Sequence, residues 1–221
     1  MDTYKKNKFI DDKIWSYCLE HSKPNSRLLC SLKSYTYKNI HGSHMLSETL
    51  VTKFLQLLIH LLDPKICIDL GTYTGLSAIA MAEATNNSAT IHTIDKVGQS
   101  GEKTADFFIK KSDFREKIKV HKKDAIEILS TIKEKIDFAF IDANKSETLK
   151  YFNIIFKNLS KKGVIIVDDA LWRGEVVKPQ NKRSKIFDEF NKYILNNKSL
   201  ENILLPFRNG LNVIYRKKII L

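Results

Sequence analysis

Residues 65–84 read KICIDLGTYTGLSAIAMAEA, and this stretch decides the fold of the chain. Its first part, 65–71, is an apolar segment of strand length that ends in Asp69 and Gly71. Its last part, 77–84, is an apolar segment of helical composition. The glycines of the loop between them let the backbone turn tightly and approach a ligand closely. The stretch therefore predicts a strand, a loop and a helix in succession.

The same alternation of strand and helix continues downstream. Four more apolar segments of strand length follow, at 90–95, 117–124, 136–142 and 164–169. Helical segments lie between them, which is typical of a parallel, doubly wound sheet. Two final strands, 201–207 and 211–217, are separated by only Arg208-Asn209-Gly210, which predicts an antiparallel hairpin. The sequence therefore predicts an α/β fold with a mixed seven-stranded sheet.

The residues before the first strand predict helices. The pattern from 8 to 62 is helical throughout, with an apolar stripe formed by Leu46, Leu50, Phe54, Leu57, Leu58 and Leu61. It ends at Asp63-Pro64, because proline cannot continue a helix. A chain of 221 residues without repeats or linkers fits one domain. We expect an N-terminal helical cover, 1–62, and a cofactor- and metal-binding α/β core, 63–221.

The composition indicates a globular cytoplasmic protein, with 43% hydrophobic and 28% charged residues. The first residues carry charges throughout and lack the apolar region of a secretory signal. The longest apolar run, 50–62, is interrupted by three polar side chains and is shorter than the about 20 residues that a membrane span needs. The three cysteines form no CxxC arrangement, so we expect reduced thiols. No membrane association is expected.

The net charge of +12 has two interpretations. From residue 178 to the end, ten Lys/Arg stand against three Asp/Glu, which concentrates +7 in the last fifth of the chain. A basic region of this kind can attract nucleic acid, an anionic substrate or an acidic membrane. We favour a solvated, lysine-rich surface, because no RNA-binding pattern of interleaved aromatic residues and glycines is present.

Each of the five predicted parallel strands ends in an acid. These acids are Asp69, Asp95, Asp124, Asp142 and the pair Asp168/Asp169. A single acid at a strand end is commonly a helix cap or a turn residue. Five in succession are harder to explain by capping, and ligands bind beyond the carboxyl ends of the strands in such sheets. The series of acids therefore indicates a binding site at one edge of the sheet.

The first two strand ends favour a nucleoside cofactor. Glycines in the first loop allow close approach, and Asp95, 26 residues after Asp69, suits a ribose diol. The dinucleotide fingerprint GxGxxG is absent, because three residues separate Gly71 from Gly75. Its absence counts against a nicotinamide dehydrogenase. A simple tight turn is the alternative interpretation of the loop.

Several motifs together resemble a known family. GTYTGLSAIAMA (71–82), the strand end at Asp95, IDANK (141–145) and DDALWRGEV (168–176) are similar to the cation-dependent, S-adenosylmethionine-dependent O-methyltransferases of the caffeoyl-CoA and catechol type. The resemblance runs from about Met45 to the terminal hairpin. It implies a Rossmann-like class I methyltransferase fold, S-adenosylmethionine, and a divalent cation (Mg²⁺, Mn²⁺ or Ca²⁺). It also implies a small aromatic hydroxyl acceptor and a homodimer.

The resemblance also implies roles for individual residues. Those expected to bind the cofactor are Met45, Ser47, Asp69, Gly71, Thr72, Tyr73, Ser77, Asp95, Asp124, Ala125 and Asp142, with Asp69 where the family usually has Glu. The metal ligands map onto Asp142, Asp168 and Asp169. Lys145 matches the lysine that assists deprotonation of the acceptor, so Lys145 and Asp142 are the expected catalytic residues. Trp172 is either a wall for an aromatic acceptor or ordinary packing, and Arg173 falls close to where substrate binds.

Strand geometry is compatible with this metal site. Neighbouring parallel strands lie about 4.8 Å apart, so acids at two adjacent strand ends can converge on one ion. Carboxylate oxygens are the ligands that hard divalent cations accept. A bound cation can stabilise the anion of a phenol, whose pKa near 10 leaves only about one molecule in 10³ ionised at pH 7.

Three departures from the family pattern bear on specificity. Asp169 stands where the family has Asn, and its charge should tighten cation binding while opposing a dianionic substrate. The residues around Lys145 and the turn Arg208-Asn209-Gly210 also differ from the usual ones. We therefore predict methyl transfer to an aromatic vicinal diol and leave two alternatives open. These are a tRNA hydroxyuridine O-methyltransferase of the same family and a non-catalytic cofactor-binding module.

Overall fold

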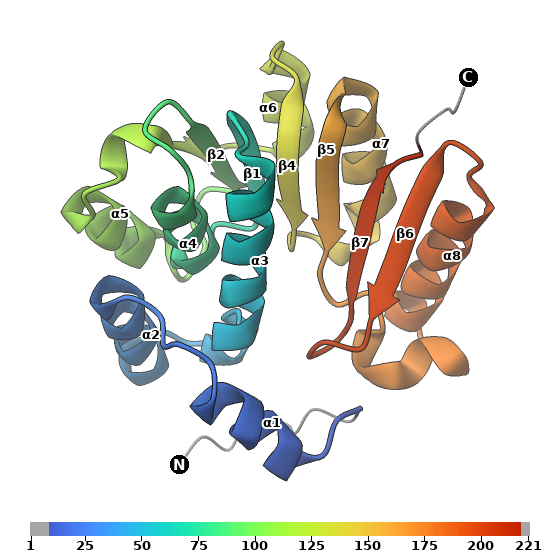
Figure 1. Ribbon diagram of the computed structural model, residues 1–221, viewed down its shortest axis with the longest axis horizontal. Coiled ribbons are helices and arrows are strands. Elements are labelled where there is room, and N and C mark those ends of the chain that lie inside the picture. The colour runs from blue at the N-terminus through green and yellow to red at the C-terminus, as the bar shows by residue number, and fades with distance from the viewer. Residues whose placement is uncertain (1–8, 218–221) are drawn as a thin grey trace.

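The computed structural model describes residues 9–217, which form one seven-stranded sheet covered by helices on both faces (Figure 1). The strands are β1 (Ile66–Leu70), β2 (Thr90–Asp95), β3 (Ile118–Lys122), β4 (Ile136–Ile141), β5 (Leu159–Val167), β6 (Leu200–Leu205) and β7 (Leu211–Arg216). Their order in the sheet is β3-β2-β1-β4-β5-β7-β6. β1 to β5 are parallel, and β7 is antiparallel to both β5 and β6. The predicted mixed sheet and terminal hairpin are confirmed.

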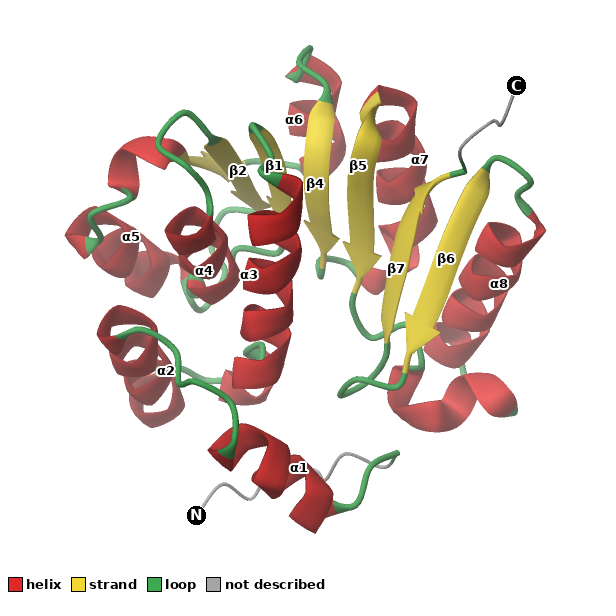
Figure 2. Cartoon of the chain, in the orientation of Figure 1, coloured by secondary structure: helices red, strands yellow, loops and turns green. Residues whose placement is uncertain are grey.

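The helices form a layer on each side of the sheet (Figures 1 and 2). On one side lie α2 (Arg27–Asn39), α3 (Thr49–Leu62), α4 (Leu76–Ala84) and α5 (Glu102–Lys111), and on the other α6 (Ala125–Thr131), α7 (Thr148–Asn158) and α8 (Lys182–Asn196). α1 (Asp12–Glu20) lies beyond the lower end of α3 in this view. Short stretches of 3₁₀ helix complete the chain: η1 (Ser43–Met45), η2 (Arg115–Lys117), η3 (Lys145–Glu147) and η4 (Trp172–Val177).

The side chains of each strand point alternately to the two faces of the sheet, so the protein has two hydrophobic cores, one under each helical layer. Phe138 and Phe140 of β4 pack with the α2–α5 layer, whereas Ala139 and Ile141 pack with the α6–α8 layer. Successive side chains of a strand point to opposite faces, and a central parallel strand is buried on both. This explains why the strands read as continuous apolar runs. Each fully buried large apolar side chain contributes about 1.5–3 kcal/mol.

The N-terminal prediction was wrong in detail. Within the described part of 8–62 the helical pattern is broken twice, after α1 and again between α2 and α3. Ser26 begins α2 by accepting a hydrogen bond from the Leu29 N–H, and Gly42, at φ +83°, lies in the second break. The predicted stripe is also misplaced on α3, because Leu57 and Leu61 are exposed. Leu46 and Leu50 of the stripe are buried, and Phe54 and Leu58 pack partly buried against the core. The buried face of α3 is formed by Leu50, Val51, Thr52, Leu55 and Ile59.

Two other boundaries bear on the predictions. β5 begins at Leu159 rather than at 164, because Leu159 pairs with Ile136 of β4 before a shift in register. The ends of the predicted domain, 1–8 and 218–221, lie outside the described residues. The described cysteines Cys18, Cys30 and Cys67 are all free.

Ser43–Leu62 is long and apolar enough by composition for a membrane span. It is not one continuous helix, since a non-helical stretch separates η1 from α3, and α3 packs on α4.

Candidate functional site

The loop after β1 and the end of β4 are pressed together at the carboxyl edge of the sheet. Asp142 donates its backbone N–H to the Leu70 carbonyl at 2.8 Å. Gly71 has φ +106°, and a Cβ there would lie 2.6 Å from the Asp142 carbonyl oxygen. Only glycine fits this conformation and this approach. The contact brings Asp142 next to the first loop.

A pocket opens over this loop, and we call it the inner pocket. Its lining is Met45, Leu46, Ser47, Gly71, Thr72, Tyr73, Thr74, Leu76, Ser77 and Asp142. Seven of the predicted cofactor residues are among these: Met45, Ser47, Gly71, Thr72, Tyr73, Ser77 and Asp142. The first three lining residues come from the end of η1 and the segment that leads into α3, so residues distant in sequence close one pocket.

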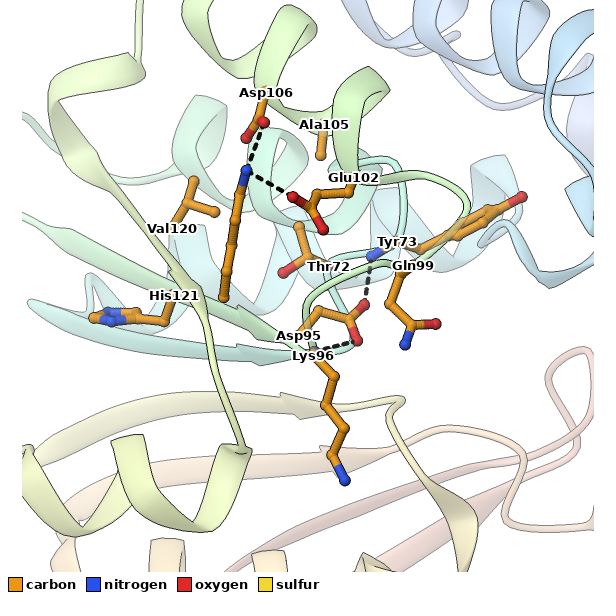
Figure 3. Close-up of a pocket in the computed structure, with 11 residues that line it drawn as sticks. Thr72, Tyr73, Asp95, Lys96, Gln99, Glu102, Ala105, Asp106, Val120 and His121 are labelled. Carbon is orange, nitrogen blue, oxygen red and sulfur yellow. Dashed lines mark hydrogen bonds and ion pairs between the residues drawn. The ribbon is translucent and has the colours of Figure 1, made fainter.

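A second pocket adjoins the first, and we call it the outer pocket (Figure 3). It shares Thr72 and Tyr73 with the inner pocket and is otherwise lined by Asp95, Lys96, Gln99, Glu102, Ala105, Asp106, Val120, His121 and Lys122. The two pockets together form a groove along the ends of β1 and β2. Apart from Asp95, sequence reasoning missed these additional residues, which lie outside any recognisable motif.

Asp95 is held in a fixed position at the junction. Its carboxylate accepts hydrogen bonds from the backbone N–H groups of Tyr73 at 3.0 Å and Lys96 at 2.9 Å, as Figure 3 shows. Burial raises the pKa of Asp95, although these two hydrogen bonds oppose the shift. The Tyr73 ring points away from Asp95 in the same view, and its hydroxyl donates to the His41 carbonyl at 3.3 Å.

Asp69 lies beneath the inner pocket and does not line it. The side chain is fully buried, and one carboxylate oxygen accepts from the Thr93 hydroxyl at 2.7 Å. The other oxygen, Oδ1, has no hydrogen-bond partner among residues 9–217. Burial raises the pKa of Asp69 to about 7. An unpaired buried oxygen is costly, and protein atoms enclose this one.

Asp124 and Ala125 line neither pocket. The Asp124 carboxylate caps α6 by accepting from the Ile126 N–H at 2.9 Å, and it pairs with Lys96 at 3.3 Å. Helix capping therefore explains this acid structurally. Because Lys96 lines the outer pocket, Asp124 reaches the groove only through that lysine.

Three acids and two bases gather beyond the ends of β4 and β5, and we call them the acid cluster: Asp142, Asp168, Asp169, Lys145 and Arg208. Lys145 forms ion pairs with Asp142 and with Asp169, the latter at 3.0 Å. The Asp168 side chain is fully buried, and its Oδ2 lies 3.5 Å from the Arg208 guanidinium. The structure thus brings the three predicted metal ligands and the predicted catalytic lysine together.

Charge and burial shift the protonation of the cluster. Burial raises the pKa of Asp168 to about 7 and also raises the pKa of Asp142. Burial alone would raise the pKa of Asp169 too, but Lys145 and Arg208 hold it below its usual value. The same carboxylates raise the pKa of Lys145 against the effect of burial. Lys145 is therefore an ammonium ion here, so its role as a proton acceptor stays a prediction for an ion-loaded site.

The hairpin turn supplies two side chains that the sequence did not assign to the site. Arg208 contacts Asp168, and the Asn209 amide donates to the Asp169 carboxylate at 2.9 Å. The only signal in the sequence was that this turn departs from the family pattern. A turn that lies 40 residues after the acids gives no local indication of such contacts.

Trp172 and Arg173 follow the acids in η4 but face another element. The Trp172 ring stacks on Phe187 of α8, with centroids 5.6 Å apart, and the Arg183 guanidinium lies 5.4 Å from the same centroid. Arg173 is exposed and lies 5.8 Å from the Trp172 centroid. Neither residue lines the groove. Packing explains Trp172, and the substrate roles of both residues stay predictions.

The acid cluster suits a divalent cation in the type of its ligands. Its three carboxylates are the oxygen donors that Mg²⁺, Mn²⁺ and Ca²⁺ accept. Among residues 9–217, however, no three acids, histidines or cysteines are spaced as a ready metal site. Lys145 and Arg208 pair with these carboxylates, so an ion and these cations would compete for the same oxygens.

Comparison with known proteins identifies the family. The O-methyltransferase family matches residues 19–218. The chain belongs to this O-methyltransferase family. It is 29% identical to catechol O-methyltransferase domain-containing protein 1 of Mus musculus over 93% of this chain and 80% of that protein. It is also 29% identical to caffeoyl-CoA O-methyltransferase 1 of Zea mays, over 75% of this chain and 69% of that protein.

Solved structures share the fold of this O-methyltransferase. The SAH-bound methyltransferase PaMTH1 of Podospora anserina superposes with a TM-score of 0.86 at 23% identity, covering 94% of this chain and 95% of that one. TomG of Streptomyces achromogenes, in complex with SAM, gives 0.83 at 19% identity, covering 95% and 100%. The predictions of the family, of the class I fold and of a SAM-dependent O-methyltransferase are confirmed.

Proposed function

We propose that this O-methyltransferase moves the sulfonium methyl group of S-adenosylmethionine to a hydroxyl oxygen of an aromatic vicinal diol. One observation carries the proposal: Asp142 lines the inner pocket and also pairs with Lys145 of the acid cluster. The cofactor groove therefore adjoins the cluster. A methyl donor in the groove and an acceptor oxygen at the cluster would be neighbours, which is the main requirement of a displacement reaction.

The groove has the polarity that the cofactor needs. The inner pocket would take the methionine part, and the charge of Asp69, which interacts with the lining residues Ser77 and Asp142, favours a cationic amino group there. Asp95 in the outer pocket would accept from the ribose hydroxyls. That PaMTH1 and TomG, which have the same fold, hold SAH and SAM supports this use of the groove.

The acid cluster would activate the acceptor. Ionising a phenol at pH 7 costs about 4 kcal/mol, because its pKa of about 10 lies roughly 3 units above the pH of the medium. The Lys145 ammonium would stabilise the oxyanion by charge and by hydrogen bonding. Asp142, Asp168 and Asp169 would hold a divalent cation, and when bound that cation supplies Lewis-acid stabilisation of the same oxyanion. Fixed side chains of the cluster would orient the acceptor oxygen.

The substrate class rests on the family. The relatives in Mus musculus and Zea mays are named for catechol and for caffeoyl-CoA, both of which contain an aromatic vicinal diol. We extend this acceptor class to the present chain. A homodimer and a cytoplasmic location stay predictions. Light scattering of the purified protein would measure its molar mass and so test whether it is a dimer.

A turnover assay tests the proposal. Methyl-labelled S-adenosylmethionine would be incubated with dihydroxybenzoates, caffeate esters or bulk tRNA, each with Mg²⁺ and with EDTA. We expect label in a dihydroxy compound and loss of most of the transfer in EDTA. Asp95→Asn should weaken cofactor binding in calorimetry, whereas Asp113→Asn, at an exposed acid, should not. Cofactor binding without transfer to any acceptor would favour the non-catalytic module instead.

A specific observation keeps the tRNA alternative open. Exposed basic residues gather at the start of α8, which packs on η4 directly after the acid pair: Lys178, Lys182, Arg183 and Lys185. Such a cluster near the acceptor side would suit a phosphate backbone. Label in tRNA, together with retention on tRNA that weakens steeply with salt, would show that the acceptor is a hydroxylated uridine and not a small molecule.

A further inference from the structure

Arg208 is a buried cation at the proposed metal site. It lies in the turn between β6 and β7 with φ +56°, and its side chain is 10% exposed. Its guanidinium lies 3.5 Å from Asp168 Oδ2, donates to the His44 carbonyl at 3.1 Å, and lies 3.8 Å from Glu48. One side chain thus joins the hairpin turn, the acid cluster and the segment that covers the inner pocket.

Arg208 lies where it would compete with a divalent ion for Asp168. Asp168 is fully buried, so its charge needs nearby partners. Its Oδ1 accepts from the Asp169 N–H at 2.7 Å, and the cation that faces its Oδ2 is Arg208. An ion bound by Asp168 would share that carboxylate with the guanidinium. The two cations would also repel each other at short range, where screening by water and salt is weak.

The charge of the whole cluster favours the same conclusion. With all three carboxylates ionised, Lys145 and Arg208 offset two of the three negative charges that an incoming ion would otherwise meet, and Arg208 is shared with Glu48. Asn209 adds a hydrogen bond that fixes Asp169 without any ion. The acids are therefore held together by the protein itself, and ion binding has less charge to neutralise than the acids alone suggest.

We propose that Arg208 is a resident counter-ion of the acid cluster, which keeps Asp168 in place without metal and lowers the affinity of the site for divalent cations. The proposal concerns the ion invoked in the proposed function, but it is measured by ion binding alone. Absence of methyl transfer would count against the proposed function and leave this inference unaffected. A change in ion affinity on substitution of Arg208 tests only the role given to Arg208.

Calorimetric titration of the full chain with Mn²⁺ tests the proposal. Arg208→Gly removes the charge at a φ that glycine accepts readily, so the turn should be kept. We expect its Mn²⁺ affinity to be at least about tenfold higher than that of the wild type. Arg208→Lys, which keeps a positive charge, should stay close to the wild type. Lys217→Gly removes the same charge at an exposed pair with Glu201 and should change nothing.

Two results would overturn the proposal. One is equal or weaker Mn²⁺ binding by an Arg208→Gly protein whose circular dichroism and melting curve show a folded state. The other applies even if that variant does not fold, because it uses the wild type. We expect about 0.1 mM Mn²⁺ to raise the wild-type Tm by less than about 2 °C, and a rise above about 5 °C would show tight binding in spite of Arg208.

Discussion

In the proposed mechanism, acceptor activation depends most directly on Lys145. Its ammonium lies between Asp142 and Asp169 and lines neither pocket of the groove. We expect Lys145→Met to lower kcat by about 10²-fold, the usual cost of losing one stabilising group for an oxyanion. SAH affinity by calorimetry should not change. Lys150→Met, at an exposed position on α7, is the control, and an unaltered kcat for Lys145→Met would remove the residue from the mechanism.

Asp69 makes stability depend on pH. Burial raises its pKa from 3.8 to about 7, so the folded state binds the proton more tightly than the unfolded state. Stability of the cofactor-free protein should therefore fall as the pH rises from about 4 to 7, by up to about 1.4 kcal/mol per unit. Asp69→Asn stays neutral, and we expect it to flatten this decline and to raise Tm at about pH 8. Calorimetric scans at about pH 5 and pH 8 check this, with Asp113→Asn as an exposed control.

At the scale of elements, the junction between β1 and β4 controls the geometry of the groove. We expect Gly71→Ala to lower stability by more than about 1 kcal/mol and to weaken SAH binding, because a Cβ would collide with the Asp142 carbonyl 2.6 Å away. Gly98→Ala is the matched control, since Gly98 also has a positive φ but a Cβ there would meet no atom within 4 Å. Similar losses of SAH affinity in both variants would exclude the steric cause.

The end of α4 shows a contact of a different kind. The Lys117 side chain is buried and donates to the carbonyls of Ala82 at 2.8 Å and Thr85 at 2.9 Å, where the helix ends. Lys117→Met would remove the Lys117 donor from both carbonyls and leave only the Thr85 hydroxyl on that of Ala82, so it should cost about 2 kcal/mol, or about 4–8 °C in Tm. Lys119→Met, exposed on β3, should melt as the wild type does. Equal melting temperatures for the two variants would contradict the capping role.

The elements that were predictable from the sequence are those with a local signal. The five parallel strands were visible because each apolar run stops at an acid, and these acids indicated the candidate site. The two breaks in the N-terminal helices were missed, although Pro24 before Ser26 and Gly42 are local signals for a helix end. Lys117 and Arg208 could not be assigned either. Arg208 contacts His44 across 164 residues, and no local pattern encodes such a contact.

At the scale of the whole molecule, an acceptor meets two sources of charge. The acid cluster lies at the carboxyl edge of the parallel strands, whereas much of the net charge of +12 lies in the last fifth of the chain. A small aromatic acceptor would respond to the local field of the cluster. A nucleic acid would respond to the distributed positive charge, which is screened over about 8–10 Å at ordinary salt. Ionic strength therefore distinguishes the two acceptor classes.

We expect kcat/KM for a dihydroxybenzoate to change by less than about threefold between 50 and 200 mM salt, because a small acceptor makes no series of phosphate contacts. The double variant Lys182→Glu, Arg183→Glu should have the same value, since both residues are exposed on α8 and line neither pocket. A protein that neutralised six to ten phosphates would instead lose about 10³–10⁵ in affinity over this range. A loss of that size for tRNA, abolished by the double variant, would mean that the basic region is part of the acceptor site and that the enzyme modifies RNA.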